Sequence, residues 1–231
     1  MVAEVVLALD LPEPDEALRL LDRIPELHWV KVGPVLLTRA GAPFVQELRR
    51  RGLRVFLDLK WHDIPNTVSG AVAAAREMGV AMATVHTLGG MGMMSAAARA
   101  AGDDLALLGV TVLTAHDAAS YSAATGRPDV DLKAEVGRLA GEAKRAALAG
   151  VVCSPHEIGL VRSAFGGHPL VVVPGIRGRQ DTSGDQVRVS TAGDAAAKGA
   201  THLVVGRPIL QAADPGAAFR ALAEEAMCPV V

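Results

Sequence analysis

Short apolar runs of strand length recur along the chain, and longer segments of helical period separate them. The eight runs are Val5–Leu9, Trp29–Val32, Leu53–Leu59, Ala81–Val85, Leu105–Leu113, Gly150–Cys153, Leu170–Val173 and His202–Val205. The segments between them include Asp15–Ile24, Pro43–Arg51, Val68–Met78, Met93–Ala101, Leu132–Leu148 and Ala192–Lys198. Nearly continuous apolar runs are typical of strands buried on both faces, so this alternation predicts an α/β fold with a parallel sheet covered by helices. The count of eight favours a closed (β/α)8 TIM barrel over an open sheet. No linker or shift in composition divides residues 1–231, so we expect a single domain.

Polar residues follow most of the predicted strands at the point where each strand ends. In chain order they are Asp10, Lys31, Asp58 with Lys60, His86, Thr114, Ser154, Pro174-Gly175 and Gly206-Arg207. The carboxyl ends of the strands in such a barrel meet at one mouth, which carries the active site of these enzymes. We therefore expect these side chains to converge on one site although they lie far apart in the sequence.

The most distinctive of these stretches is Asp58-Leu59-Lys60-Trp61-His62-Asp63-Ile64-Pro65-Asn66-Thr67. Alternate residues of a strand share a face, so Asp58 and Lys60 are predicted to project to the same side. Burying such a pair is costly unless its geometry is favourable, which makes a purely stabilising role a weak explanation. Two structural interpretations stay open: Asp58 and Lys60 form an ion pair of the core, or Asp63 is a helix N-cap with Pro65 in the first turn.

Two glycine- and arginine-containing segments follow the seventh and eighth predicted strands. They are Val173–Arg179, which includes Pro174, Gly175 and Arg177, and Val205–Pro208, which includes Gly206 and Arg207. Glycine lets the backbone approach an anion, arginine offers a planar fork, and this pair of loops is a frequent phosphate site in barrels. We expect a phosphate group here, although either segment alone could be an ordinary loop with solvated arginines. The polar stretch Arg179–Arg188 is predicted to be a lid over the ligand.

Composition and charge exclude several classes of function. The net charge is −2 and the pI is about 6.4, so there is no basic footprint for nucleic acid or anionic lipid. No apolar run has the length of a membrane span, and the first residues lack the positive region of a secretion signal, so we expect a cytoplasmic protein. Cys153, Cys228 and the histidines show no metal-ligand spacing, so no metal is expected. His86 fits a hydrogen-bonded core histidine better than a catalytic one, and Thr114 could contact a flat polar ring.

The stretch from Asp58 to Thr67 closely resembles the signature of the orotidine 5′-phosphate decarboxylase family. The resemblance covers nearly the whole chain, and the other segments that carry it are Leu7–Asp10, Val30–Gly33, Val112–Thr114, Pro174–Arg177, Gly184–Gln186 and Val205–Pro208. The Asp-x-Lys-x-x-Asp spacing by itself is shared with sugar-phosphate decarboxylases, whereas the longer motif is more specific. Trp61 stands where the family is expected to have Phe.

The resemblance implies a cofactor-independent decarboxylation of orotidine 5′-monophosphate to uridine 5′-monophosphate, with a role for each matching residue. Lys60, a cation that can also give up a proton, would stabilise and protonate the C6 carbanion. Asp58 would lie beside the leaving carboxylate and hold Lys60 in line. The resemblance further implies contacts with the ribose hydroxyls (Asp10, Lys31), the pyrimidine (Thr114), the phosphate (Pro174, Arg177, Gly206, Arg207), base and phosphate together (Gln186), and the neighbouring site of a homodimer (Asp63, Thr67). It also implies that Lys31 and Asp10 complete a catalytic array of alternating lysines and aspartates with Asp58 and Lys60.

Two alternatives remain open from the sequence. The first is a 3-keto-gulonate-phosphate decarboxylase or hexulose-phosphate synthase, which uses Mg²⁺ and therefore carboxylate ligands. Lys31 stands where that branch is expected to place an acidic residue, which disfavours a cation. The second is a non-catalytic barrel that binds a phosphosugar, for which the charges at Asp58, Lys60 and Asp63 have no use.

Overall fold

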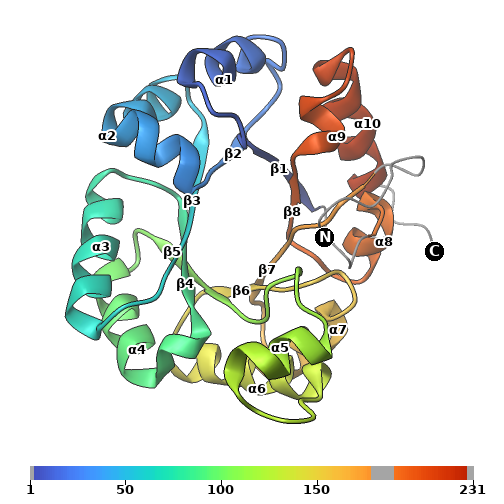
Figure 1. Cartoon of the computed structure of the whole chain (residues 1–231). Helices are drawn as coiled ribbons and strands as arrows, with labels where there is room; N and C mark the ends of the chain where they lie inside the picture. The colour runs from blue at the N-terminus through green and yellow to red at the C-terminus, as the bar shows by residue number, and fades with distance from the viewer. Residues whose placement is uncertain (1–2, 178–189, 228–231) are drawn as a thin grey trace.

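Eight parallel strands form a closed barrel in the computed structural model, which describes residues 3–177 and 190–227 (Figure 1). The strands are β1 (Glu4–Ala8), β2 (Trp29–Val32), β3 (Arg54–Trp61), β4 (Met82–His86), β5 (Ala106–Val110), β6 (Gly150–Val152), β7 (Leu170–Val173) and β8 (His202–Val205). The helices are α1 (Pro14–Leu21), α2 (Pro34–Arg50), α3 (Pro65–Glu77), α4 (Gly90–Ala101), α5 (Ala118–Thr125), α6 (Leu132–Arg145), α7 (Ile158–Phe165), α8 (Ala192–Ala197), α9 (Arg207–Leu210) and α10 (Pro215–Met227). A 3₁₀ turn, η1 (Thr87–Gly89), follows β4.

Each strand pairs with its neighbours in chain order, and β1 closes the ring against β8 with Val6 opposite Val204. Parallel neighbours require a crossover, which the intervening helices supply on the outside of the ring (Figure 1). The predicted (β/α)8 barrel is therefore confirmed. Its strand polarity brings the carboxyl ends of all eight strands to one mouth.

Two apolar layers hold the barrel together. The larger lies between the strands and the helices, where alternate strand residues such as Leu7, Leu57 and Val205 are fully buried. The smaller fills the barrel interior and consists of Val6, Ala8, Trp29, Phe56, Met82, Leu108, Val172 and Val204. Burial on both faces explains why the strands read as continuous apolar runs.

The amino-terminal end of the barrel is closed by an aromatic cluster. The Trp29 and His202 rings meet edge to face with centroids 4.9 Å apart, and the Arg54 guanidinium lies 4.2 Å from the Trp29 ring centroid. Burial, together with the positive charge of Arg54, lowers the pKa of His202 to about 4. The imidazole is therefore neutral at physiological pH, as its place in the core requires.

The observed element boundaries differ from the predicted ones at informative places. The strand predicted at Leu53–Leu59 continues to Trp61, with a register shift against β4 between Leu57 and Trp61. The helix predicted from Pro43 begins at Pro34, because two helical segments join at a kink where Gly41 has φ +63°. Helices α5, α7, α9 and α10 were not among the predicted segments, and β5 is shorter than the predicted run Leu105–Leu113.

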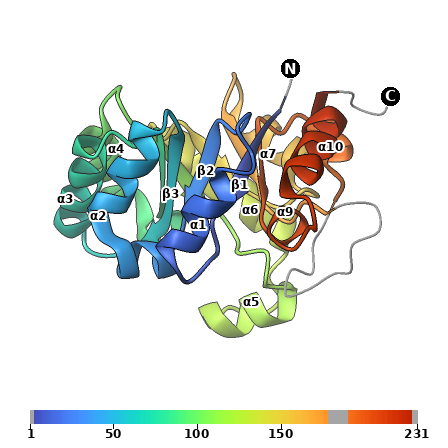
Figure 2. The ribbon, with the colours of Figure 1, turned by 90° about the horizontal axis from the view of Figure 1, so that it is seen from above.

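Helix α5 stands outside the ring of helices, beyond one end of the barrel (Figure 2). It begins with a capping box in which the Asp117 carboxylate accepts a hydrogen bond from the backbone N–H of Ser120. Tyr121 on α5 donates a hydrogen bond over 3.0 Å to the buried carboxylate of Glu135 on α6. Arg127, which follows α5, donates to the same carboxylate over 2.8 Å, so this ionic cluster fixes α5 next to the mouth.

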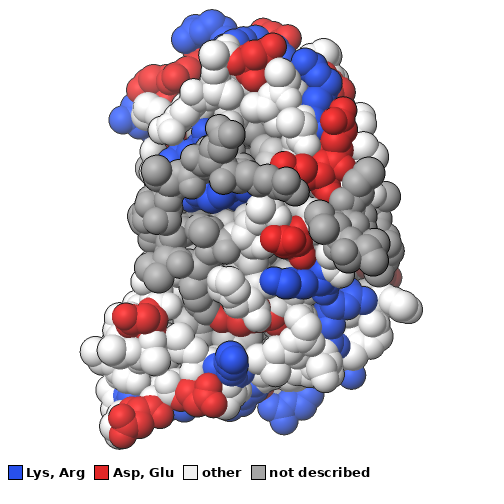
Figure 3. Space-filling model, turned by 90° about the vertical axis from the view of Figure 1, so that its right-hand side faces the viewer, with Lys and Arg blue, Asp and Glu red and all other residues white. Residues whose placement is uncertain are grey.

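The outer surface carries charges of both signs. On the face shown in Figure 3, the basic and acidic side chains of the described residues are interspersed. Within residues 3–177 and 190–227, no helix is long and apolar enough to cross a membrane.

Candidate active site

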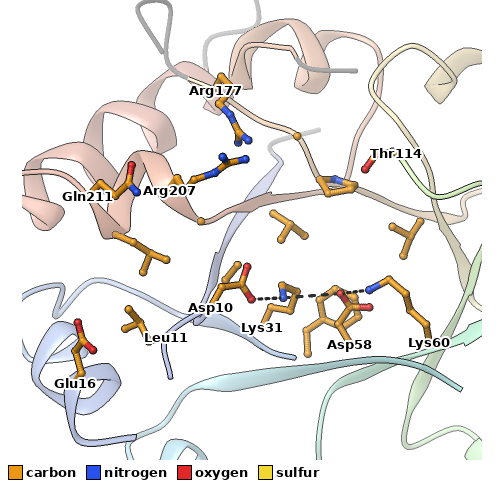
Figure 4. A pocket seen from close by; sticks show the side chains of 18 residues that line it. Asp10, Leu11, Glu16, Lys31, Asp58, Lys60, Thr114, Arg177, Arg207 and Gln211 are labelled. Atoms are coloured by element: carbon orange, nitrogen blue, oxygen red, sulfur yellow. Dashed lines mark hydrogen bonds and ion pairs between the residues drawn. The ribbon is translucent and has the colours of Figure 1, made fainter. Parts of the chain in front are cut away.

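A cavity of about 790 Å³ opens at the mouth of the barrel, where the strands end (Figure 4). It is lined by Ala8, Asp10, Leu11, Glu16, Lys31, Phe56, Asp58, Lys60, Thr114, Val152, Pro174, Gly175, Arg177, Val204, Gly206, Arg207, Leu210 and Gln211. Most of the polar residues predicted at strand ends are in this set, and the barrel closure brings them together. The volume is in the range of pockets that enclose a small-molecule ligand.

Four charged side chains of alternating sign form a row across the floor of this cavity (Figure 4). Lys31 Nζ lies 2.9 Å from Asp10 Oδ1 and 3.9 Å from Asp58 Oδ2, and Lys60 Nζ lies 2.9 Å from the same Asp58 oxygen. The side chains of Lys31 and Asp58 are only 10% and 13% exposed, so their charges are poorly screened by water. Asp58 and Lys60 do form the ion pair of the structural interpretation, but the pair lines a cavity and continues into Lys31 instead of lying in the core.

An irregularity in β3 aims Asp58 and Lys60 at the cavity. Regular alternation would place both on one face, but the register shift before Trp61 breaks the ladder there and Lys60 has φ +51°. This left-handed conformation is uncommon for a residue other than glycine. The backbone N–H of Lys60 donates to the Thr84 hydroxyl on β4 instead of to a strand carbonyl. Sequence reasoning missed Thr84, because a threonine in the apolar run Met82–Val85 is an ordinary strand former.

Two arginines point into the cavity from the opposite side of the row (Figure 4). Arg177 follows β7 and is 8% exposed; its backbone N–H donates to the Ser190 carbonyl over 3.0 Å, and a guanidinium N–H donates to the Ile176 carbonyl. Arg207 begins α9 directly after β8. Gly175, with φ +81°, lies before Arg177 and makes the left-handed turn that leads the chain out of β7. The cavity thus has a cationic side built from the two loops that the sequence singled out.

Asp63 and Thr67 do not line this cavity. Both are exposed, and the Asp63 carboxylate accepts a 2.6 Å hydrogen bond from the backbone N–H of Ile64. Helix α3 begins at Pro65 with Ile64 in the N-cap position and no side-chain cap, so the interpretation of Asp63 as the N-cap is wrong.

His86 lies beside the site rather than in it. Its Nδ1 accepts a hydrogen bond from the backbone N–H of Leu88, and its ring stacks on His62 with centroids 5.5 Å apart. Burial, then the positive charges of His62 and Lys60, lower the pKa of His86 to about 4. A neutral, hydrogen-bonded imidazole agrees with the structural interpretation. Gln186 and the predicted lid Arg179–Arg188 lie outside the described residues.

The donor set of the site suits an anionic organic ligand. The described residues contain no group of three or more His, Cys, Asp or Glu side chains that could hold a metal ion. Two arginines on one side can bind a phosphate, since guanidinium groups offer paired N–H donors. The row on the other side holds two ammonium groups in fixed positions, where they can stabilise negative charge that develops on a substrate.

Comparisons with known proteins agree on one relationship. A family model described as "Orotidine 5′-phosphate decarboxylase / HUMPS family" matches residues 3–222. The chain is 49% identical over 229 residues to an orotidine 5′-phosphate decarboxylase of Halorhodospira halophila, with 96% of this chain and 94% of the relative covered. It is 48% identical over 227 residues to a protein of the same name from Alkalilimnicola ehrlichii, with 96% of each covered. The crystal structure of an orotidine 5′-phosphate decarboxylase from Lactobacillus acidophilus superposes with a TM-score of 0.86 at 34% identity, with 96% of this chain and 98% of that chain covered.

Proposed function

The chain belongs to the orotidine 5′-phosphate decarboxylase / HUMPS family, and from that membership we propose how its charged row and its two arginines act on a substrate. The protein is a carboxy-lyase that converts orotidine 5′-monophosphate to uridine 5′-monophosphate in pyrimidine biosynthesis. The observation that carries the proposed mechanism is the continuous row Asp10, Lys31, Asp58 and Lys60 opposite Arg177 and Arg207 in one cavity.

The sugar-phosphate branch of the family fits this site less well. The family model's description names two kinds of enzyme, but both relatives described above are named orotidine 5′-phosphate decarboxylase. A divalent cation prefers several carboxylate oxygens. Here Lys31 lies between Asp10 and Asp58 and within 3.9 Å of an oxygen of each, so an ammonium group takes the position of a bridging cation.

The two sides of the cavity divide substrate binding between them. We assign the phosphate to Arg177 and Arg207, with the backbone of Pro174 and Gly206 beside it. Asp10, which is exposed to the cavity, and Lys31 can both hydrogen-bond the ribose hydroxyls. Thr114 lies across the cavity from the row (Figure 4), and we assign it to the base. Gln186 remains assigned to the base and phosphate from the sequence motif.

The chemistry follows from where negative charge develops. When the bond from C6 to the carboxylate carbon breaks, CO₂ leaves and the electron pair stays on C6 in the plane of the ring, where the ring π system cannot delocalise it. The Lys60 ammonium stabilises this carbanion and then transfers a proton to C6, after which the neutral amine takes a proton from water. Asp58, 2.9 Å from Lys60 Nζ, holds the ammonium group in place and pointed at C6.

A homodimer would complete the site with Asp63 and Thr67 of the partner. Both residues are exposed and do not line the cavity of their own chain, which is compatible with a role in the cavity of a partner chain. Three large apolar side chains on or next to the contacting elements α3, η1 and α4 are also exposed: Ile64 by 66%, Leu88 by 39% and Met91 by 38%. Exposed apolar surface of this kind is compatible with an interface between subunits.

Substrate choice tests the activity directly. Purified protein should remove the absorbance of orotidine 5′-monophosphate, and uridine 5′-monophosphate should appear in equal amount. A 3-keto-gulonate phosphate should not react, with or without Mg²⁺. Turnover of the sugar phosphate in place of the nucleotide would move the protein to the other branch, and turnover of neither would favour a phosphosugar-binding barrel.

Subunit exchange tests the shared site. Lys60→Ala and Asp63→Ala should each inactivate the homodimer, whereas a mixed dimer would keep one site with native Lys60 from one chain and native Asp63 from the other. Random exchange makes half of the dimers mixed, so the mixture should recover about one quarter of wild-type activity. If mass spectrometry shows exchange and activity does not return, Asp63 serves its own chain.

A further inference from the structure

Thr84 on β4 contacts two of the groups to which the mechanism assigns the chemistry. It is fully buried, with 0% of its surface exposed, and it does not line the cavity. Its hydroxyl oxygen lies 3.0 Å from Asp58 Oδ1 and 2.8 Å from the backbone nitrogen of Lys60. A single buried hydroxyl therefore contacts both the Asp58 carboxylate and the backbone of Lys60. In the proposed mechanism these two residues lie next to the reacting carbon.

The direction of both hydrogen bonds follows from the protons available. A threonine hydroxyl has one proton to donate and lone pairs that accept. The backbone N–H of Lys60 can only donate, so the Thr84 oxygen accepts from it and gives its own proton to Asp58 Oδ1. The other carboxylate oxygen, Oδ2, remains for the ammonium groups of Lys60 and Lys31. Asp58 is thus held at both oxygens, from β2, β3 and β4.

Lys60 needs this hydroxyl because of its backbone conformation. The register shift between Leu57 and Trp61 interrupts the pairing of β3 with β4, and Lys60 has φ +51° at this interruption. A buried backbone N–H without an acceptor costs about as much as a lost hydrogen bond, and an uncommon φ persists only where its surroundings hold it. The Thr84 hydroxyl takes the place of the missing strand carbonyl and holds the irregular backbone that carries the Lys60 side chain into the cavity.

We propose that Thr84 is a positioning residue for catalysis, which sets the orientation of the Asp58 carboxylate and the backbone of Lys60 through one hydroxyl group. This inference rests on the roles proposed above for Asp58 and Lys60. It assigns no substrate contact to Thr84, so its loss should act on the chemical step and leave ligand binding nearly intact.

The chain offers a matched control for the hydroxyl. Thr87 in η1 is also 0% exposed, and its hydroxyl donates over 2.7 Å to the Val110 carbonyl without touching Asp58 or Lys60. Valine has nearly the shape of threonine but no hydroxyl, so Thr84→Val and Thr87→Val each remove one buried hydrogen-bonding group from neighbouring places. Thr84→Ser keeps the hydroxyl and removes only a methyl group.

The experiment measures kcat and KM for orotidine 5′-monophosphate, the affinity for uridine 5′-monophosphate and the melting temperature of the four proteins. Thr84→Val should lower kcat on the order of 10- to 100-fold, because small displacements of catalytic groups have effects of this size. Its KM and product affinity should stay within about threefold of wild type, since binding rests on the arginines and the ribose contacts. Thr84→Ser should keep kcat within about threefold of wild type, and Thr87→Val should lose melting temperature without this loss of kcat.

Two results would overturn the inference: a Thr84→Val enzyme with the kcat of Thr87→Val, or a Thr84→Ser enzyme as slow as Thr84→Val. If Thr84→Val does not fold, Thr84→Cys replaces it, because a thiol has a similar shape but is a weak donor and acceptor. Its kcat should then be at least about fivefold below that of Thr84→Ser, and equal values would also overturn the inference. Lys60→Ala, assayed in parallel, separates the two proposals: an inactive Lys60→Ala beside a fully active Thr84→Val refutes the role of Thr84 alone, whereas an active Lys60→Ala refutes the mechanism on which it rests.

Discussion

Replacing Lys60 with alanine should abolish most of the turnover while the barrel remains folded. Asp58 loses the ammonium group at 2.9 Å but keeps that of Lys31 at 3.9 Å and the hydroxyl of Thr84. The substitution therefore leaves no uncompensated buried charge, which is the usual reason that breaking a buried ion pair destabilises a protein. Melting temperature and product affinity should change little.

The size of the kinetic effect can be worked out from the position of the ammonium group. A carbanion about 3 Å from a fixed cation, at an effective dielectric constant of about 20, is stabilised by about 5 kcal/mol. At about 1.4 kcal/mol per tenfold in rate, this corresponds to a loss of nearly four orders of magnitude in kcat. The Lys60 side chain is 37% exposed, so water screens part of this attraction.

Steady-state assays on orotidine 5′-monophosphate give kcat and KM for this variant. Lys133→Ala, which removes an exposed lysine at the start of α6, is the matched control and should behave as wild type. A folded Lys60→Ala enzyme that retains more than about a tenth of wild-type kcat, a barrier change below about 1.4 kcal/mol, would refute the assignment even after allowance for screening.

Two further predictions concern the phosphate side of the cavity and the amino-terminal end of the barrel. Arg207→Ala should lower kcat/KM strongly for orotidine 5′-monophosphate but little for orotidine, which lacks the phosphate; equal fractional losses on both would show that Arg207 acts on the fold or the base. His202 has its pKa lowered from 6.5 to about 4, so the unfolded chain takes up a proton at higher pH than the folded one. The neutral His202 therefore contributes fully to the free energy of unfolding above about pH 6.5. As the pH falls to about 4, this contribution of about 3 kcal/mol is lost. Denaturant unfolding at several pH values measures this effect. The free energy of unfolding should decline less steeply with falling pH for His202→Gln than for wild type and for His168→Gln, which changes an exposed histidine. The same decline in all three proteins would contradict the prediction.

The fold could be predicted because a parallel barrel buries both faces of its strands. Each strand then appears as an apolar run, and the polar residue that ends it marks the mouth. Boundaries were less predictable where one residue changes the backbone. The kink at Gly41 joins two helical segments into α2, and the short helix α5 has no amphipathic pattern because it projects beyond the barrel.

The cavity-lining charges were predictable, but the way they are held was not. Asp58 and Lys60 stand out because charges at the end of a core strand need an explanation. Strand alternation places them on the same side, whereas the structure achieves the contact through a register shift and a left-handed Lys60. Thr84 escaped notice because its partners come from another strand, 24 and 26 residues away in the sequence. A threonine among apolar residues has no local signal that distinguishes a positioning hydroxyl from a strand former.

The central claim is that fixed protein charges, without a metal ion or organic cofactor, support a carbanion at C6 and its protonation. The most direct measurement follows the reaction of orotidine 5′-monophosphate by proton NMR in D₂O, with enzyme exhaustively dialysed against EDTA. The account predicts uridine 5′-monophosphate that carries deuterium at C6, formed at the same rate as with untreated enzyme. Loss of turnover after dialysis, with recovery only when Mg²⁺ is added, would contradict it.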